Sequence, residues 1–221
     1  MKTLPNTAYP IALVGRIAAL IMLSCCALMT HAESVEDMLA QMVVIENNTA
    51  LRQAAIAEGA ERAQLCFRCH GKDGNSTRDY IPNLASQNAA YLFTQFEKFA
   101  DGSRQDYVMN ALAKHLTAEE RIAIALYYSQ HEVVEREQPV AAAAEGERVY
   151  KSMCFACHGE AGHGNAQYPR IAGQPYEFLQ NTLLKFHSND SERRDSPMVS
   201  IIQNLDEAQL NDVAAYIAHM P

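Results

Sequence analysis

The chain has 221 residues, with 18 Lys and Arg against 26 Asp and Glu and a formal net charge of −8. This acidic balance argues against nucleic acid as a partner, because an acidic surface repels the phosphate backbone. The length leaves room for two small domains.

The beginning of the chain has the order of charged, apolar and small residues that is typical of a secretory signal peptide. Lys2 and Arg16 precede the apolar run 17–29, and residues 30–32 offer small side chains to a signal peptidase. The run is too short to cross a bilayer comfortably as a permanent helix, so we expect residues 1–32 to be removed by cleavage near Ala32. An uncleaved anchor and a lipoprotein cut before Cys25 are the alternatives.

The segment 33–49 is predicted to form an additional amphipathic helix, which has no counterpart later in the chain. Its apolar residues recur at the spacing of one helical face, and Asn47-Asn48-Thr49 ends the pattern. Because such a face usually packs on a core, we expect this helix to cover the first domain. A docking surface for another protein is the alternative.

Two Cys-x-x-Cys-His motifs carry the chemistry: Cys66-Phe67-Arg68-Cys69-His70 and Cys154-Phe155-Ala156-Cys157-His158. A single Cys pair is also compatible with a redox dithiol or half of a zinc site. The His directly after the second Cys, present in both copies, instead favours covalent haem, with the thiols bound to the porphyrin and the imidazole to iron. The sequence therefore predicts two covalently bound haem c groups, held by Cys66 and Cys69 and by Cys154 and Cys157, with His70 and His158 as iron ligands.

The two motifs belong to an internal repeat. Cys154 follows Cys66 by 88 residues (154 less 66), and other features recur at nearly the same offset. The segment 82–87 matches 169–174, for example. The repeat divides the chain after the additional helix into a first haem domain, a linker and a second haem domain: 50–131, 132–144 and 145–221.

The periodicity predicts an all-α fold. Apolar residues recur at three and four residues in 91–99, in 178–186 and in the last helix of each repeat. Thr117 to Glu120 forms a capping-box sequence before one of these last helices, and Asp206 to Gln209 is close to one before the other. No segment has a convincing strand pattern.

Met109 and Met198 are the candidates for the second axial ligand of each iron. They lie 39 residues beyond His70 (109 less 70) and 40 beyond His158 (198 less 158), which is enough chain to reach the opposite haem face. Thioether sulfur is a soft, neutral ligand that raises the potential. Ordinary core methionines are the alternative, although core methionines seldom recur in register.

Pro82 and Pro169 occupy matching places between each haem motif and the following helix. A proline carbonyl there is free to accept the imidazole N–H of the haem histidine, and such hydrogen bonds orient the ligand and tune its basicity. The alternative is that either proline only stiffens its loop.

The duplicated motifs, the segments 82–87 and 169–174 and the downstream methionines together resemble the dihaem cytochromes c known as cytochrome c4, over about residues 57–221. The resemblance implies a tandem pair of class I cytochrome c domains, each with a covalently attached haem, related by a pseudo-twofold axis. The helix predicted for 33–49 departs from that pattern.

The resemblance also implies electron transfer in the periplasm. We expect a quinol-oxidising complex as donor and a terminal oxidase or reductase as acceptor, with peripheral membrane association left open. A His and Met ligand pair predicts a carrier and not an enzyme, because catalysis at iron needs an open coordination position. The alternative is the cytochrome subunit of a periplasmic dehydrogenase, or a haem enzyme acting on a small inorganic substrate.

Overall fold

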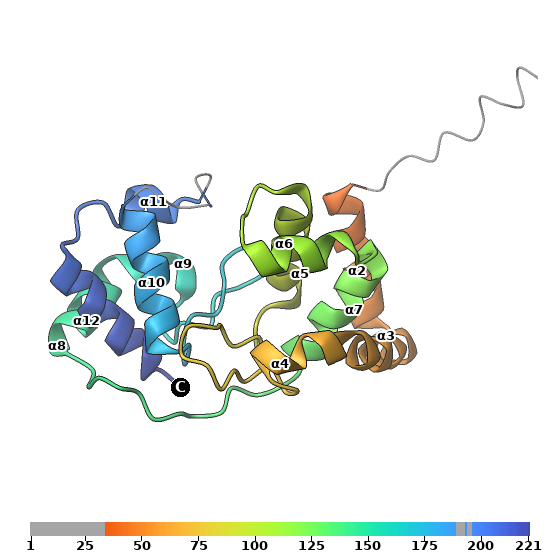
Figure 1. The fold of residues 1–221 in the computed structure, drawn as a ribbon, viewed down its shortest axis with the longest axis horizontal. Helices are drawn as coiled ribbons and strands as arrows, with labels where there is room; N and C mark the ends of the chain where they lie inside the picture. The colour runs from red at the N-terminus through yellow and green to blue at the C-terminus, as the bar shows by residue number, and fades with distance from the viewer. Residues whose placement is uncertain (1–33, 189–192, 194–195) are drawn as a thin grey trace, which may run out of the picture. The chain divides into compact units, whose positions relative to one another are not determined.

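A computed structural model describes residues 34–188, 193 and 196–221. The predicted signal peptide, residues 1–32, lies outside the described residues. The regular elements in the described part of the chain are all helical, as the periodicity predicted, and it contains no strand (Figure 1).

The part of the chain before the linker begins with two consecutive helices, and Asn48 both follows the first and caps the second by accepting hydrogen bonds from the backbone N–H groups of Ala50 and Leu51. The elements of this part are α2 (Val35–Asn47), α3 (Thr49–Arg62), the 3-10 turn η1 (Ala63–Leu65), α4 (Phe67–His70), α5 (Ala89–Asp101), α6 (Tyr107–Lys114) and α7 (Ala118–Ser129).

The second repeat has the same order of elements from its haem motif onward. A π-helical turn leads directly into that motif. The elements are α8 (Ala144–Val149), the π-helix η2 (Tyr150–Cys154), α9 (Phe155–His158), α10 (Tyr176–His187), α11 (Met198–Ile201) and α12 (Glu207–Ala218).

Both predicted capping boxes are present. The Thr117 hydroxyl accepts from the N–H of Glu120, whose carboxylate accepts in return from the N–H of Thr117, at the start of α7. Asp206 and Gln209 make the same reciprocal pair at the start of α12. Each box satisfies two backbone donors that a helix terminus otherwise leaves unpaired, which explains where the last helix of each repeat begins.

Each repeat has its own hydrophobic core. Phe93 and Tyr128 are fully buried in the first core, and Tyr150 and Leu210 are fully buried in the second. In the first repeat α3 packs on α7, and in the second α8 packs on α12.

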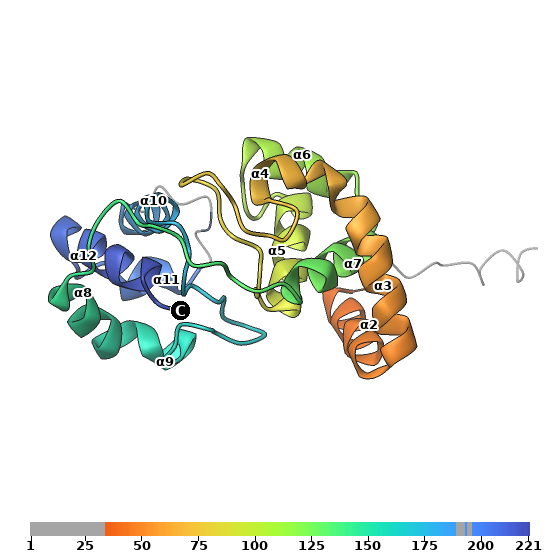
Figure 2. The same cartoon turned by 90° about the horizontal axis from the view of Figure 1, so that it is seen from below.

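The additional helix α2 packs on the first core, which confirms the expectation from its apolar stripe. Met38 and Met42 are its buried residues and belong to the first core. Figures 1 and 2 show α2 alongside α3. Val43 and Val44, in contrast, are 53% and 61% exposed, so the helix uses only one face for this packing.

The segment between α7 and α8 has little regular structure and contacts both repeats. Arg136 donates to the carbonyl oxygen of Ser76 at 3.0 Å and pairs with Asp79 in the first repeat. Two residues later, the Gln138 amide donates to the carbonyl oxygen of Ala218 in the second, at 3.0 Å. This segment is therefore held against both cores.

Candidate haem-binding sites

The haem-motif histidines are buried and oriented by the prolines that the sequence singled out. His70 donates its Nδ1–H to the carbonyl oxygen of Pro82 at 3.0 Å, and His158 donates to that of Pro169 at 2.9 Å. Because a carbonyl oxygen only accepts, the proton must lie on Nδ1 in both rings. Nε2 is then the nitrogen with a free lone pair, which is the form that binds iron.

Burial favours the neutral form of both imidazoles. Burial lowers the pKa of His70. The hydrogen bond to Pro82 and the charge of Asp106 act in the opposite direction, because they favour the protonated ring. Burial also lowers the pKa of His158, against the hydrogen bond to Pro169. A neutral ring is the species that can act as a metal ligand.

The four motif cysteines form no disulfides and are partly accessible. In each repeat one helical turn carries the second Cys and the His, and the first Cys lies immediately before that turn. Burial raises the pKa of Cys66 to about 11, with a further contribution from Cys69, and burial raises the pKa of Cys154 to about 11. Within the described residues no group of three or more His, Cys, Asp or Glu side chains is placed to hold a metal ion.

Each haem motif is followed by a glycine with positive φ, a backbone conformation that residues with side chains rarely adopt. Gly71 has φ 80° and Gly159 has φ 78°. The Tyr128 hydroxyl donates to the carbonyl oxygen of Gly71 at 3.3 Å, and the Tyr150 hydroxyl donates to that of Gly159 at 2.5 Å. The chain therefore turns sharply after each His and is tied to the core there.

Met109 and Met198 are partly buried, and each packs against the core of its own repeat. The structure places both in short helices: Met109 is in α6 and Met198 is the first residue of α11. The Asp106 side chain caps α6 by accepting from the N–H groups of Val108 and Met109, at 3.0 and 2.8 Å. A local side-chain cap that periodicity does not detect thus turns this segment into a helix.

The two repeats meet through side-chain amides whose role the sequence did not reveal. Gln174 accepts from the N–H of Asn83 at 2.8 Å and donates to its carbonyl oxygen at 2.9 Å. Gln87 makes the same pair of hydrogen bonds with the backbone of Arg170, at 2.7 and 2.8 Å. The only sequence signal was that both glutamines recur in register within the matched segments 82–87 and 169–174.

Arg170 carries a buried polar atom that suits an anionic group. Its guanidinium donates to the carbonyl oxygen of Pro221 at 2.8 Å, while its Nε is buried without a hydrogen-bond partner among the described residues. Burial lowers the pKa of this group. A haem brings two propionate carboxylates, so the oriented histidines, the thiol pairs and this unpaired donor all fit a haem group.

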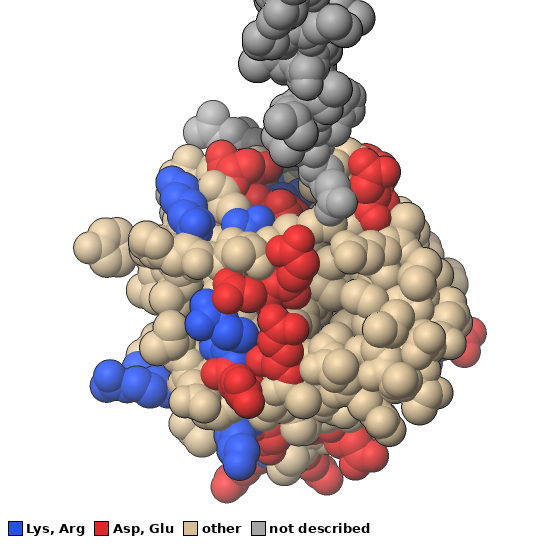
Figure 3. Space-filling view, turned by 90° about the vertical axis from the view of Figure 1, so that its right-hand side faces the viewer, with Lys and Arg blue, Asp and Glu red and all other residues tan. Residues whose placement is uncertain are grey.

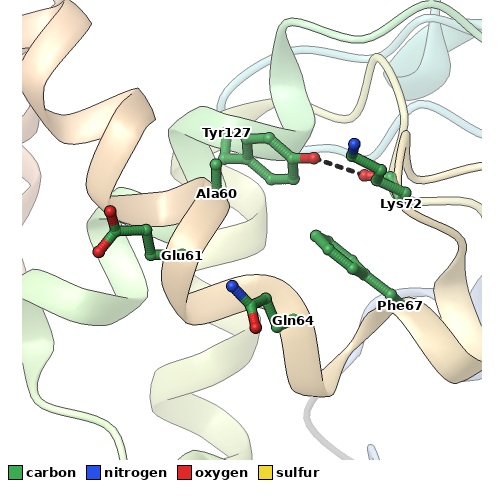
Figure 4. A pocket seen from close by; sticks show the side chains of 6 residues that line it. All are labelled: Ala60, Glu61, Gln64, Phe67, Lys72 and Tyr127. Carbon is green, nitrogen blue, oxygen red and sulfur yellow. Dashed lines mark hydrogen bonds between the residues drawn. The ribbon is translucent and has the colours of Figure 1, made fainter.

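An open hollow of about 560 Å³ flanks the first haem motif (Figure 4). Phe67, the residue after Cys66, lines one side of the hollow, and Tyr127 lines another. The Tyr127 hydroxyl donates to the carbonyl oxygen of Lys72 at 2.6 Å. The two rings are 6.3 Å apart between centroids. The hollow belongs to the surroundings of the motif, since Phe67 is part of it.

Two haem-attachment turns, each with a buried and oriented histidine in an all-helical repeat, define a c-type cytochrome with two haem sites. The family described as Cytochrome c matches residues 143–221. The chain is 32% identical over 185 residues to the thiosulfate dehydrogenase electron acceptor of Thiomonas intermedia (strain K12), covering 76% of this chain and 84% of that protein. It is 28% identical over 199 residues to cytochrome c4 of Pseudomonas aeruginosa, covering 83% and 98%.

Solved structures agree with this assignment. Reduced recombinant cytochrome c4 from Pseudomonas stutzeri matches with a TM-score of 0.67 at 25% identity, covering 74% of this chain and 97% of that one. Thiosulfate dehydrogenase (TsdBA) from Marichromatium purpuratum matches with a TM-score of 0.65 at 29% identity, covering 75% of this chain and 40% of that one. The chain belongs to the cytochrome c4 family.

Family membership confirms three expectations from the sequence. The chain has two haem c groups as cofactors, it is an electron carrier and not an enzyme, and its partners are redox proteins.

Proposed function

We propose that this chain carries electrons in the periplasm from a quinol-oxidising complex to a terminal oxidase or reductase, with His70 and Met109 at one iron and His158 and Met198 at the other. The observation that carries the proposal is the duplicated site. In both repeats a buried histidine is held by a proline carbonyl, and a methionine packs on the same core.

When bound, each haem supplies an iron that accepts and returns one electron. The residues of the chain hold and orient that group: Cys66 and Cys69 attach one haem, and Cys154 and Cys157 attach the other. The prolines hold each imidazole in one tautomer and one orientation. A ligand pair that stays the same in both oxidation states requires little rearrangement, which suits a carrier.

The proposed periplasmic location is supported by the order of charged, apolar and small residues in 1–32. Among the described residues, no helix is both long enough and apolar enough to cross a membrane. Cleavage near Ala32 would release the haem domains from the membrane, and mass spectrometry of the purified protein would identify the mature N-terminus.

The comparisons support a second candidate donor. Two relatives are named thiosulfate dehydrogenase electron acceptor, and the chain also matches part of a thiosulfate dehydrogenase structure. A thiosulfate dehydrogenase is therefore an alternative donor to the quinol-oxidising complex for this chain, and it would use the same two haem sites.

Stopped-flow kinetics with purified holoprotein tests these proposals. We expect membranes that contain a terminal oxidase to oxidise the reduced protein rapidly, and a quinol-oxidising complex with quinol to reduce it. Faster reduction by thiosulfate dehydrogenase with thiosulfate would select the second donor. Steady turnover of thiosulfate, nitrite or peroxide by the pure protein alone would contradict a carrier role.

A further inference from the structure

We propose that Gln87 and Gln174 are positioning residues that each tune the haem histidine of the opposite repeat, through one peptide group. The proposal deepens the proposed function and rests on the assignment of His70 and His158 as iron ligands. The resulting arrangement is crossed: Gln174 of the second repeat acts on His70, and Gln87 of the first repeat acts on His158.

The peptide group between Pro82 and Asn83 connects the two partners at the first site. Its carbonyl oxygen, which belongs to Pro82, accepts the Nδ1–H of His70 at 3.0 Å. Its N–H, which belongs to Asn83, donates to Oε1 of Gln174 at 2.8 Å. Gln174 is fixed in this position because its Nε2 donates to the carbonyl oxygen of Asn83 at 2.9 Å.

The peptide group between Pro169 and Arg170 repeats the arrangement at the second site. Its carbonyl oxygen accepts the Nδ1–H of His158 at 2.9 Å, and its N–H donates to Oε1 of Gln87 at 2.7 Å. Gln87 is fixed by a second hydrogen bond, from its Nε2 to the carbonyl oxygen of Arg170 at 2.8 Å. The prolines, the residues after them and the glutamines of the two sites each correspond at an offset of 87 residues. The contact between the two repeats is therefore pseudosymmetric.

The hydrogen-bonded path from each glutamine through the peptide group to the opposite histidine, called the relay below, is shielded from water. The exposed fractions are 5% for Gln87, 3% for Gln174 and 3% for Asn83. Hydrogen bonds in such a low-dielectric environment are electrostatically stronger than in water, and bonds in a chain polarise one another. An N–H that donates to a glutamine oxygen makes the carbonyl of the same peptide group a better acceptor.

A better acceptor at Pro82 or Pro169 draws the Nδ1 proton and makes the imidazole a more basic ligand. A more basic ligand stabilises ferric iron relative to ferrous iron and so lowers the potential. The imidazole keeps its proton while the iron takes one electron from the redox partner. The contact between the repeats thereby contributes to the potential of both haems.

The test uses the full-length holoprotein with either glutamine replaced by Met, which preserves side-chain length, or by Ala. The two haem potentials are assigned by following the signals of each haem by NMR during a redox titration. For Gln174→Met or Gln174→Ala we expect the potential of the haem at His70 to rise and that of the haem at His158 to stay the same. Replacement of Gln87 should give the reverse pattern.

A second readout is the Nδ1 proton of each histidine in the ferrous protein. Its NMR resonance should move upfield and exchange faster at the opposite site only, because the hydrogen bond to the proline carbonyl weakens. Asn88→Ala is the matched control: the Asn88 side chain donates across the same contact to the carbonyl oxygens of His163 and Tyr168 but bonds to neither the Pro82–Asn83 nor the Pro169–Arg170 peptide group. We expect it to leave both potentials unchanged.

Any other result would contradict the proposed relay. A shift at the haem of the same repeat, an equal shift at both haems, or an Asn88→Ala effect as large as those of the glutamine variants would show a general loosening of the contact. Unchanged potentials in all glutamine variants would eliminate the relay while leaving the carrier function intact. Failure of the ligand assignment is recognised separately, because His70→Ala or His158→Ala would then leave the iron absorption spectrum unaltered.

Discussion

Gly59 in α3 lies directly against Ala123 in α7: a Cβ on Gly59 would collide with the Ala123 carbonyl group and come within 2.8 Å of the Tyr127 Cβ. Gly146 in α8 stands in the same relation to Asp212 and Tyr216 of α12, with the Tyr216 Cβ at 2.9 Å. In both repeats the helix before the haem motif can cross the last helix closely because it carries a glycine at the contact.

Gly59→Ala and Gly146→Ala should therefore destabilise the protein through overpacking. We expect a loss of about 1–3 kcal/mol in the free energy of unfolding for either change, because backbone atoms at the contact cannot move aside easily. Denaturant titration of the holoprotein measures it. Ala57→Ser, on the exposed side of α3, is the control and should change the value by less than about 0.5 kcal/mol. Equal effects of the two kinds of substitution would contradict the close-crossing explanation.

Met109→Ala and Met198→Ala should each open one iron. The altered protein should lose part of its sulfur-to-ferric-iron absorption in the far red, bind carbon monoxide at one haem and show a lower potential there, because an axial thioether favours ferrous iron. Met38→Leu is the control, since Met38 is buried in α2 and belongs to the core. Unchanged spectra in both variants would refute the ligand assignment.

Asp106→Ala should affect the first haem site without removing a ligand. Its carboxylate caps the helix that carries Met109, so we expect a loss of about 1 kcal/mol in stability and a weaker sulfur-to-iron absorption at that haem only. Asp106→Asn retains a capping oxygen and should keep the normal sulfur-to-iron absorption. A normal absorption spectrum in Asp106→Ala would mean that the position of Met109 does not depend on the cap.

Association with redox partners should weaken as salt is added. The chain has a formal net charge of −8, and Figure 3 shows a band of acidic side chains on the face that carries α2 and α3. A partner with a basic patch would be attracted over a distance that salt shortens. The second-order rate constant of electron transfer should thus fall with ionic strength, and a rate that rises instead would indicate an acidic partner surface.

Features that depend on local order were predictable from the sequence. The spacing in Cys-x-x-Cys-His is set within one helical turn, and the capping boxes before α7 and α12 are set within four residues, so their residue types alone define them. The repeat also made the hydrogen bonds to Pro82 and Pro169 predictable, since two matched loops at matched distances from a histidine imply the same contact. The hydrogen bonds of His70 and His158 to these prolines are present in the structure.

The tertiary structure alone decided which groups of the two repeats meet. Gln174 and Asn83 are 91 residues apart in the chain, and Gln87 and Arg170 are 83 apart. A glutamine amide can pair with any backbone group, so its residue type does not specify a partner. Periodicity likewise did not reveal that Met109 lies in a helix or that Gly59 faces a backbone carbonyl. Such contacts depend on how separately formed helices pack, and their directional hydrogen bonds form only after that packing has brought the two repeats together.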